Sequence, residues 1–200
     1  MKNFDNSYLT AGIRFLAGID EAGRGPLAGP VVAAAVIFSE DTYNPEINDS
    51  KKVSPKLREI LFDWIMQSAV SVGIGIIDQN EIDKINILQA ALKAMKIAAG
   101  KLKPQPDLLL IDGNKIFESK VKTIPVIKGD SKSFSIAAAS IIAKVTRDRI
   151  MEKASLKEPQ YLWHKNKGYG TREHIEAIKK FGYTSFHRKT FLTNILFNNK

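Results

Sequence analysis

The chain has 200 residues, of which 44% are hydrophobic, and its 30 Lys and Arg residues against 21 Asp and Glu residues give a formal net charge of +9. A chain of this length buries a core of its own, and the lack of cysteine excludes disulfide bonds and thiolate metal sites. The lack of cysteine also suits a cytoplasmic protein, which we expect. No apolar run approaches the ~20 residues that span a membrane, so nucleic acid is favoured over a membrane surface as the anionic partner. The charge alone fits a lysine-rich protein without such a partner equally well.

Three apolar runs in the first half of the chain predict strands, and they cover residues 14–19, 31–38 and 69–77. A loop rich in glycine and proline joins the first two. Ser54 and Pro55 predict the start of a helix that ends near residue 67, because serine caps helices well and proline suits the first helical position. Apolar residues at steps of three and four predict a second helix over residues 85–99.

Two further strands and a long helix are predicted in the second half. Residues 108–111 are wholly apolar, which is typical of a central strand covered on both faces. Pro125 places the strand predicted at 121–127 at an edge of the sheet, because proline cannot donate to a neighbouring strand. The helix predicted over residues 133–153 has small side chains in its middle that allow close approach to a sheet.

The far end of that helix is basic, and we expect it to face solvent or a phosphate chain through Lys144, Arg147 and Arg149. An aromatic and basic loop follows at residues 160–171, and a last helix is predicted to begin near Thr171, whose hydroxyl can cap it. The order of elements predicts an α/β fold with a mixed sheet of about five strands. We expect a main domain over residues 1–155 and a C-terminal helical extension over residues 156–200.

Acidic residues follow three of the predicted strands: Asp20 with Glu21 beside it, Asp112, and Asp130. If the strands that carry Asp20 and Asp112 are parallel neighbours, these side chains converge on one edge of the sheet. Two carboxylates about 4 Å apart repel by ~4 kcal/mol at an effective dielectric of about 20. A divalent cation would relieve that repulsion, and ligands that are all oxygen select Mg²⁺ or Mn²⁺ over zinc. Two such ions suit phosphodiester hydrolysis, whereas a solvated turn remains the alternative.

The glycine-rich loop also satisfies G-x-G-x-x-A over residues 23–28, which is the pattern of a dinucleotide-binding loop. That pattern must follow a strand and open a helix. Here Pro26 and Pro30 interrupt the chain, and the run that follows is typical of another strand. The sequence therefore favours a backbone nest whose glycines can approach a sugar-phosphate closely.

Motifs along nearly the whole chain closely resemble, in order, those of the type 2 ribonucleases H, the bacterial ribonuclease HII family. They are GIDEAGRG at 18–25, GPV at 29–31, DSKK at 49–52, IDG at 111–113, KGD at 128–130, SIAAASIIAKVTRD at 135–148, NKGYGT at 166–171 and SFHR at 185–188. The resemblance implies a ribonuclease H-like fold, with a five-stranded mixed sheet whose first three strands are antiparallel. It also implies an endonuclease that cuts on the 5′ side of ribonucleotides in RNA–DNA hybrids and in duplex DNA, leaving 3′-hydroxyl and 5′-phosphate ends.

The resemblance gives roles to particular residues. The four metal-site acids of the family, which hold two Mg²⁺ or Mn²⁺ ions, correspond to Asp20, Glu21, Asp112 and Asp130. The loop that recognises the 2′-hydroxyl at an RNA–DNA junction corresponds to Gly23, Arg24 and Gly25, and the tyrosine that stacks beside the following deoxyribose corresponds to Tyr169. From their position near expected helix starts, we add as phosphate contacts Ser50, Lys51, Ser131 and Lys132. One departure is Tyr161-Leu162-Trp163, where many members carry Tyr-Gly-Phe.

Some alternatives stay open on the sequence alone. His187 and Arg188 can contact a nucleic-acid backbone or pack within the C-terminal tail. The apolar tail at residues 191–197 can dock on the domain or on a sliding clamp, and we expect a monomer. Two other functions remain: a nucleic-acid-binding module whose acids are structural, and a nuclease of the same fold that cuts all-DNA junctions.

Overall fold

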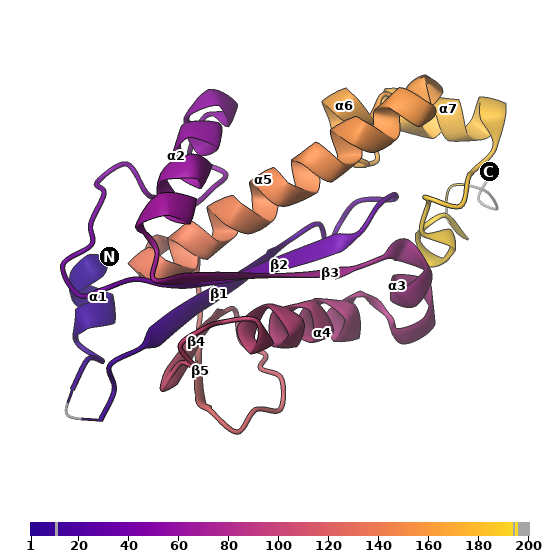
Figure 1. Ribbon diagram of the computed structural model, residues 1–200. Coiled ribbons are helices and arrows are strands. Elements are labelled where there is room, and N and C mark those ends of the chain that lie inside the picture. Colours follow the sequence, from indigo (N-terminus) through magenta and orange to yellow (C-terminus); the bar gives the residue numbers. More distant parts are fainter. Residues whose placement is uncertain (11, 194, 196–200) are drawn as a thin grey trace.

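The structure, a computed structural model, describes residues 1–10, 12–193 and 195. Its centre is a five-stranded sheet in the order β3-β2-β1-β4-β5 (Figure 1). The strands are β1 (Leu16–Ala22), β2 (Val31–Ile37), β3 (Ser71–Ile77), β4 (Leu108–Asp112) and β5 (Lys122–Val126). β1 pairs antiparallel with β2, and β2 with β3, whereas β4 runs parallel to both β1 and β5. The predicted α/β fold with a mixed sheet, antiparallel first strands and Pro125 on an edge strand is confirmed.

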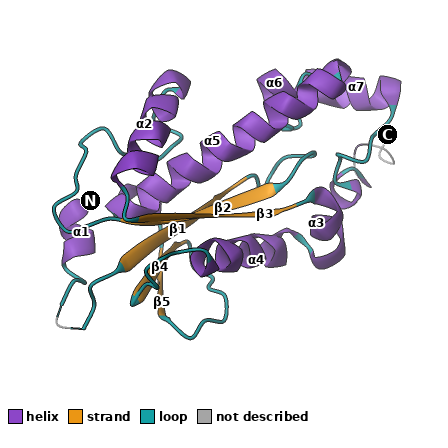
Figure 2. Ribbon diagram, in the orientation of Figure 1, coloured by secondary structure: helices purple, strands orange, loops and turns teal. Residues whose placement is uncertain are grey.

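Helices cover both faces of the sheet, as Figure 2 shows. On one face lie α2 (Pro55–Ser68) and the long α5 (Phe134–Lys157), and on the other lie α3 (Gln79–Ile85) and α4 (Ile87–Gly100). The smaller helices are α1 (Lys2–Asn6), which packs against α5, and α6 (Trp163–Asn166) and α7 (Arg172–Phe181), which follow α5 in the chain. None of the helices within the described residues is long and apolar enough to cross a membrane. The division of the chain at residues 155 and 156 stays a prediction, and α5 runs across that point.

Small residues let the two helical layers approach the sheet closely. All seven residues of β2 are buried, three of them alanine, and the first half of α5 is almost wholly buried as well. A Cβ at Gly18 in β1 would collide with the α5 backbone at Ser135, and one at Gly75 in β3 would collide with the carbonyl oxygen of Ala94 in α4. The predicted close contact of the 133–153 helix with the sheet is therefore confirmed, and glycine allows the same approach by α4.

β1 is longer than predicted at its C-terminal end. The sequence predicts that the strand stops at residue 19, whereas the structure continues it to Ala22. The extension follows from pairing with β2, because Asp20 lies opposite Ala34 and Glu21 lies opposite Ala33. The two acids therefore lie on a hydrogen-bonded strand, and their backbone is held more firmly than it would be in a loop.

The helix predicted over residues 85–99 is two helices, which is a second correction. Asn86 interrupts it with a φ of 66°, and its side chain accepts hydrogen bonds from the backbone N–H groups of Leu88 and Gln89 at the start of α4. The pattern of apolar residues continues across this break, so periodicity alone did not reveal it. The loop expected at residues 160–171 also contains structure, a 3₁₀ turn (Pro159–Tyr161) and α6.

The close approach of β3 and α4 gives a test of the fold. We expect Gly75→Ala to lower the free energy of unfolding by about 3 kcal/mol, because the new methyl group must displace the backbone of α4. Gly100→Ala is the matched control, since a Cβ there meets nothing within 4 Å and alanine favours the helix by about 1 kcal/mol. Urea unfolding of both variants measures the difference, and equal stabilities would contradict the packing described.

Candidate metal centre

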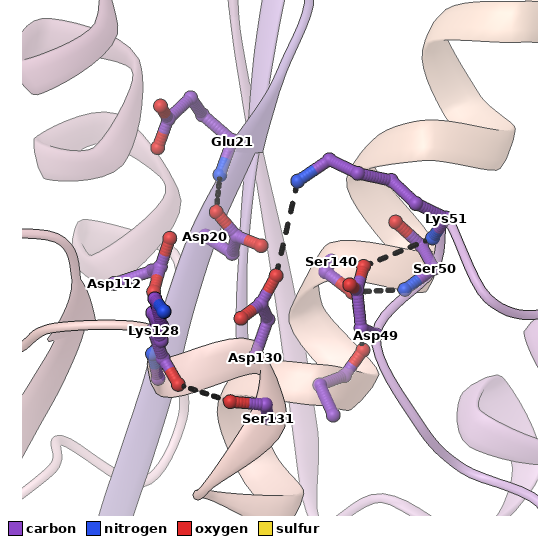
Figure 3. Close-up of polar contacts among 12 residues, drawn as sticks. Asp20, Glu21, Asp49, Ser50, Lys51, Asp112, Lys128, Asp130, Ser131 and Ser140 are labelled. Carbon is purple, nitrogen blue, oxygen red and sulfur yellow. Dashed lines mark hydrogen bonds and ion pairs between the residues drawn. The ribbon is translucent and has the colours of Figure 1, made fainter.

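Three carboxylates from separate parts of the chain converge at one end of the sheet (Figure 3). Ligand atoms of Asp20, Asp112 and Asp130 all lie within 4.8 Å of one another. Asp20 and Asp112 meet because β1 and β4 are parallel neighbours, with Ile19 opposite Ile111 in the residues just before them. Asp130 comes from a 3₁₀ turn (Gly129–Ser131) between β5 and α5. The predicted convergence of the two strand-end acids is confirmed, and the third joins them.

Backbone hydrogen bonds hold these carboxylates in place. Asp112 Oδ1 accepts from the Gly129 N–H at 2.6 Å, which fastens the turn that carries Asp130 to the end of β4. Asp20 Oδ1 accepts from the Glu21 N–H at 2.6 Å. The Lys51 Nζ lies 3.9 Å from Asp130 Oδ2, but its side chain is 84% exposed, so water screens most of its charge.

Burial and mutual repulsion both disfavour the charged forms of these acids. Burial, followed by the charges of Glu21 and Asp112, raises the pKa of Asp20 well above its usual value. Burial and the charge of Asp112 also raise the pKa of Asp130. A cluster of oxygen ligands that repel one another suits a hard divalent cation such as Mg²⁺ or Mn²⁺. The donor set therefore fits the expected divalent metal.

Glu21 lies apart from this close group. Neighbouring residues of a strand point to opposite faces, and Figure 3 shows the Glu21 carboxylate turned away from Asp20. Its Oε1 accepts from Arg24 Nη1 at 3.3 Å. Burial raises the pKa of Glu21, while Arg24 opposes that rise. With Asp112 it lines a small cavity of about 60 Å³ on the α4 side of the sheet, so its role as a metal ligand stays a prediction.

The structure brings the glycine-rich loop and Tyr169 together across the chain. A Cβ on Gly25 would have open space apart from the Tyr169 ring, whose Cε1 lies 3.8 Å away. Tyr169 itself is 44% exposed. Gly23 has a φ of +99°, and a Cβ there would collide with the Arg147 side chain. The exposed end of the loop at Arg24 and Gly25 and the exposed Tyr169 ring therefore lie side by side, and this end of the loop follows Asp20 closely in the chain.

The departure at residues 161–163 has a clear structural outcome. Leu162 adopts a left-handed conformation with a φ of 54°, which suits glycine and costs leucine about 1–2 kcal/mol. The Trp163 Nε1–H donates to His174 Nε2 at 3.0 Å, so the remaining ring nitrogen, Nδ1, carries the hydrogen that bonds the Tyr169 carbonyl at 2.9 Å. Phenylalanine at position 163 could not make the first of these bonds. Tryptophan therefore supports the backbone of Tyr169 through a histidine.

The predicted phosphate contacts need one correction. Ser50 and Lys51 do not lie at a helix start, because α2 begins at Pro55, and the Ser50 side chain is buried. Its backbone N–H donates to Ser140 Oγ at 3.3 Å instead. Ser131 and Lys132 do lie just before α5 and are exposed. Contact of these four residues with phosphate stays a prediction.

Two basic residues have surroundings that the sequence did not predict. Arg147, expected to face solvent or phosphate, is 1% exposed, so that prediction is wrong. Arg188, left open between nucleic acid and tail packing, is fully buried against the glycine-rich loop. Its neighbour His187 is buried beside His174, and burial followed by the charge of His174 lowers the pKa of His187 to about 4. All three residues serve the packing of the C-terminal part of the chain.

Comparison with known proteins agrees with the fold. The family model described as ribonuclease HII matches residues 17–198. The ribonuclease HII of Acetivibrio thermocellus is 57% identical over 185 residues, which cover 92% of this chain and 72% of the relative. The solved ribonuclease H2 of Pyrococcus horikoshii superposes with a TM-score of 0.75 at 27% identity, over 90% of this chain and 96% of that one. The ribonuclease HII in a PCNA:RNase HII complex from Archaeoglobus fulgidus gives 0.72 at 25% identity, over 88% and 94%.

The repulsion within the acid cluster predicts an effect of pH on stability. The folded state holds the Asp20 proton more tightly than the unfolded state, so without metal the stability falls as pH rises from the usual carboxyl pKa through the raised folded value. We expect Asp20→Asn in EDTA near pH 7 to have a higher free energy of unfolding than the parent, and its stability to vary less with pH.

Calorimetric melting between about pH 4 and pH 8 measures this difference. Asp63→Asn, at an exposed position on α2, is the control and should leave the melting temperature unchanged. Added Mn²⁺ should raise the melting temperature of the parent more than that of Asp20→Asn. A melting temperature lower than that of the parent for Asp20→Asn in EDTA would contradict the proposed repulsion among the buried carboxylates.

Proposed function

The chain belongs to the ribonuclease HII family, and on that premise we propose that it cuts on the 5′ side of ribonucleotides in RNA–DNA hybrids and of single ribonucleotides within duplex DNA. Its family makes it a metal-dependent endonuclease with ribonuclease H activity. The proposed products are a 3′-hydroxyl end and a 5′-phosphate end.

The convergence of Asp20, Asp112 and Asp130 carries this proposal. These three carboxylates, with Glu21 on the other side of the strand, would hold two Mg²⁺ or Mn²⁺ ions. Ions at such a site supply an activated water and stabilise the leaving oxygen. The side chains themselves must stay ionised and fixed, which the hydrogen bonds from Glu21 and Gly129 support.

Discrimination of the sugar would come from the loop beside the acids. We assign recognition of the 2′-hydroxyl to the backbone of Gly23, Arg24 and Gly25, because glycine at position 25 leaves room for close approach. The Tyr169 ring, 3.8 Å from the Cβ position of Gly25, would stack beside the next deoxyribose. Phosphates on either side of the cut would contact Lys51, Ser131 and Lys132. Ser50, next to Lys51 in the chain, would contribute through its backbone.

Nucleic acid is the partner of the family, and the net charge of +9 suits it. A ribonuclease HII from Archaeoglobus fulgidus forms a complex with PCNA. We extend that to a sliding-clamp contact through the tail at residues 191–197. Phe191 and Leu192 pack on the domain, whereas Asn194, Leu196 and Phe197 of the predicted tail lie outside the described residues. A monomeric state and a cytoplasmic location stay predictions.

One cleavage experiment tests the proposal. A DNA duplex with a single embedded ribonucleotide should be cut on the 5′ side of that ribonucleotide when Mg²⁺ or Mn²⁺ is present. Asp20→Asn should lower the rate at least about 100-fold, because ion binding contributes several kcal/mol to the transition state. Asp63→Asn, the exposed control, should cut like the parent.

Two results would reject the proposal: no cut beside the ribonucleotide, or equal cutting by Asp20→Asn. Salt-dependent binding without metal-dependent cutting would favour a non-catalytic nucleic-acid-binding module. Cutting of all-DNA junctions would favour a different nuclease of the same fold.

A second prediction concerns the aromatic side chain. Tyr169→Ala should lower kcat/KM on the same duplex by about 10-fold, since stacking on a nucleotide contributes about 1–3 kcal/mol. Tyr169→Phe should keep most of the activity. Tyr183→Ala is the matched control, because Tyr183 is 48% exposed against 44% for Tyr169. Equal losses in Tyr169→Ala and Tyr183→Ala, measured by steady-state kinetics, would remove the stacking role.

A further inference from the structure

Two arginine side chains, Arg147 and Arg188, lie buried beneath the glycine-rich loop. Arg147 is 1% exposed and Arg188 is 0% exposed. Within the described residues neither forms an ion pair with a carboxylate. An ion taken out of water costs several kcal/mol unless its surroundings compensate. Two such charges in one place therefore call for a specific compensating partner.

Backbone carbonyl groups of the loop provide that partner for Arg188. Its Nε donates to Gly29 O at 2.9 Å, and its Nη1 donates to Arg24 O at 3.0 Å. Its Nη2 donates to Gly23 O at 2.6 Å and to Pro30 O at 3.1 Å. One guanidinium group thus joins both ends of the loop between β1 and β2, using a fork of donors that no other side chain has.

Arg147, on α5, completes the arrangement from the other side. Its Nε donates to the same Pro30 O at 2.9 Å, and its Nη2 donates to Ala28 O at 3.0 Å. Its Nη1 donates to Lys167 O at 2.9 Å, two residues before Tyr169. The two guanidinium groups therefore hold the loop and the start of the tyrosine segment at once.

These bonds determine which backbone groups of the loop remain available. The carbonyl oxygens of Gly23 and Arg24 are drawn inward to Arg188. In the described part of the chain, the N–H groups of Arg24 and Gly25 enter no hydrogen bond. Free N–H groups beside buried positive charge suit an oxygen-rich ligand such as a sugar-phosphate.

The segment that carries Arg188 is itself anchored at two places. On the loop side, the Arg188 N–H donates to Leu27 O and the Gly29 N–H donates to Phe186 O, each at 2.8 Å. On the far side, the Asp83 carboxylate on α3 accepts from the N–H groups of Lys189 at 2.8 Å and Thr190 at 3.1 Å. Residues 184–190 thus connect the loop to α3, which lies on the other face of the sheet from α5.

We propose that Arg188 is a positioning residue that sets the conformation of residues 23–25 for reading the ribonucleotide, with Arg147 as its partner and Asp83 as its distant anchor. This inference rests on the proposed function and deepens it. Burial, and then the charge of Arg147, lowers the pKa of Arg188 to about 9, so the guanidinium stays protonated near neutral pH.

Arg188→Lys tests the inference, because it keeps the charge but cannot reach four carbonyl groups at once. We expect kcat/KM on the duplex with one ribonucleotide to fall about 10-fold or more, from the loss of charge-assisted hydrogen bonds. Affinity for a matched all-DNA duplex and the rise in melting temperature caused by Mn²⁺ should stay unchanged. Those two readouts separate a misplaced loop from a damaged metal site or a generally weakened protein.

Two further variants complete the design. Asp83→Ala removes the distant anchor without touching the loop, and should lower the same kcat/KM in the same selective way, though less. Leu61→Ala, on the buried face of α2, lowers stability by about 2–5 kcal/mol and should leave the substrate preference intact. If Arg188→Lys does not fold, the kcat/KM of Asp83→Ala on the same duplex is the measurement that tests the inference.

Parent-like kinetics in Arg188→Lys and Asp83→Ala would overturn the inference, as would an equal loss of affinity for the all-DNA duplex. An equal loss of kcat/KM in Leu61→Ala would overturn it as well. If the parent protein does not cut at the ribonucleotide, the proposed function itself fails. If the parent cuts and the variants match it, only the role of Arg188 fails.

Discussion

Repulsion among carboxylates at the end of β1 is the constraint on which the rest of the site depends. Asp20 is buried, and its ligand atoms lie within 4.8 Å of those of Asp112 and Asp130. Such a group stays charged only if a cation is present, so the fold alone would push these side chains apart or protonate them. The scaffold resists this because Asp20 lies on a paired strand and Asp112 is hydrogen-bonded to Gly129. The protein thus keeps ready a site that only a cation makes favourable.

Much of that scaffold could be predicted from the sequence. The apolar runs before Asp20 and Asp112 are short, and each ends in an acid, so parallel pairing brings the acids together whatever the loops do. The small side chains of α5 likewise indicate close contact with a sheet. The place of Glu21 on β1 is harder to predict from the sequence. It depends on pairing with Ala33 in β2, which no local pattern reveals. The hydrophobic pattern therefore predicts which residues form the strands, whereas cross-strand pairing decides the residue at which each strand ends.

The parts that could not be predicted involve long-range hydrogen bonds. Arg147 lies three residues after Lys144 on a helix, a setting typical of an exposed basic face, and only the tertiary fold brings it to the carbonyl groups of Ala28 and Pro30. The same holds for Arg188, 158 residues from Pro30 in the chain. Leu162 takes a backbone conformation that its residue type disfavours, because the surrounding packing compensates the strain. Local propensity carries no signal for interactions of this kind.

The acid cluster and the buried arginine pair carry charges of opposite sign, and both lie next to the short loop between β1 and β2. Asp20, on the strand that leads into the loop, belongs to the negative cluster, whereas the carbonyl groups of Gly23 and Pro30 accept hydrogen bonds from buried arginine. A phosphodiester chain is attracted to the arginine side and repelled by the uncompensated acids. With cations held by Asp20, Asp112 and Asp130, that repulsion would be removed, and the phosphodiester backbone could lie across the whole loop. If each binding event favours the other in this way, metal and substrate would be thermodynamically linked.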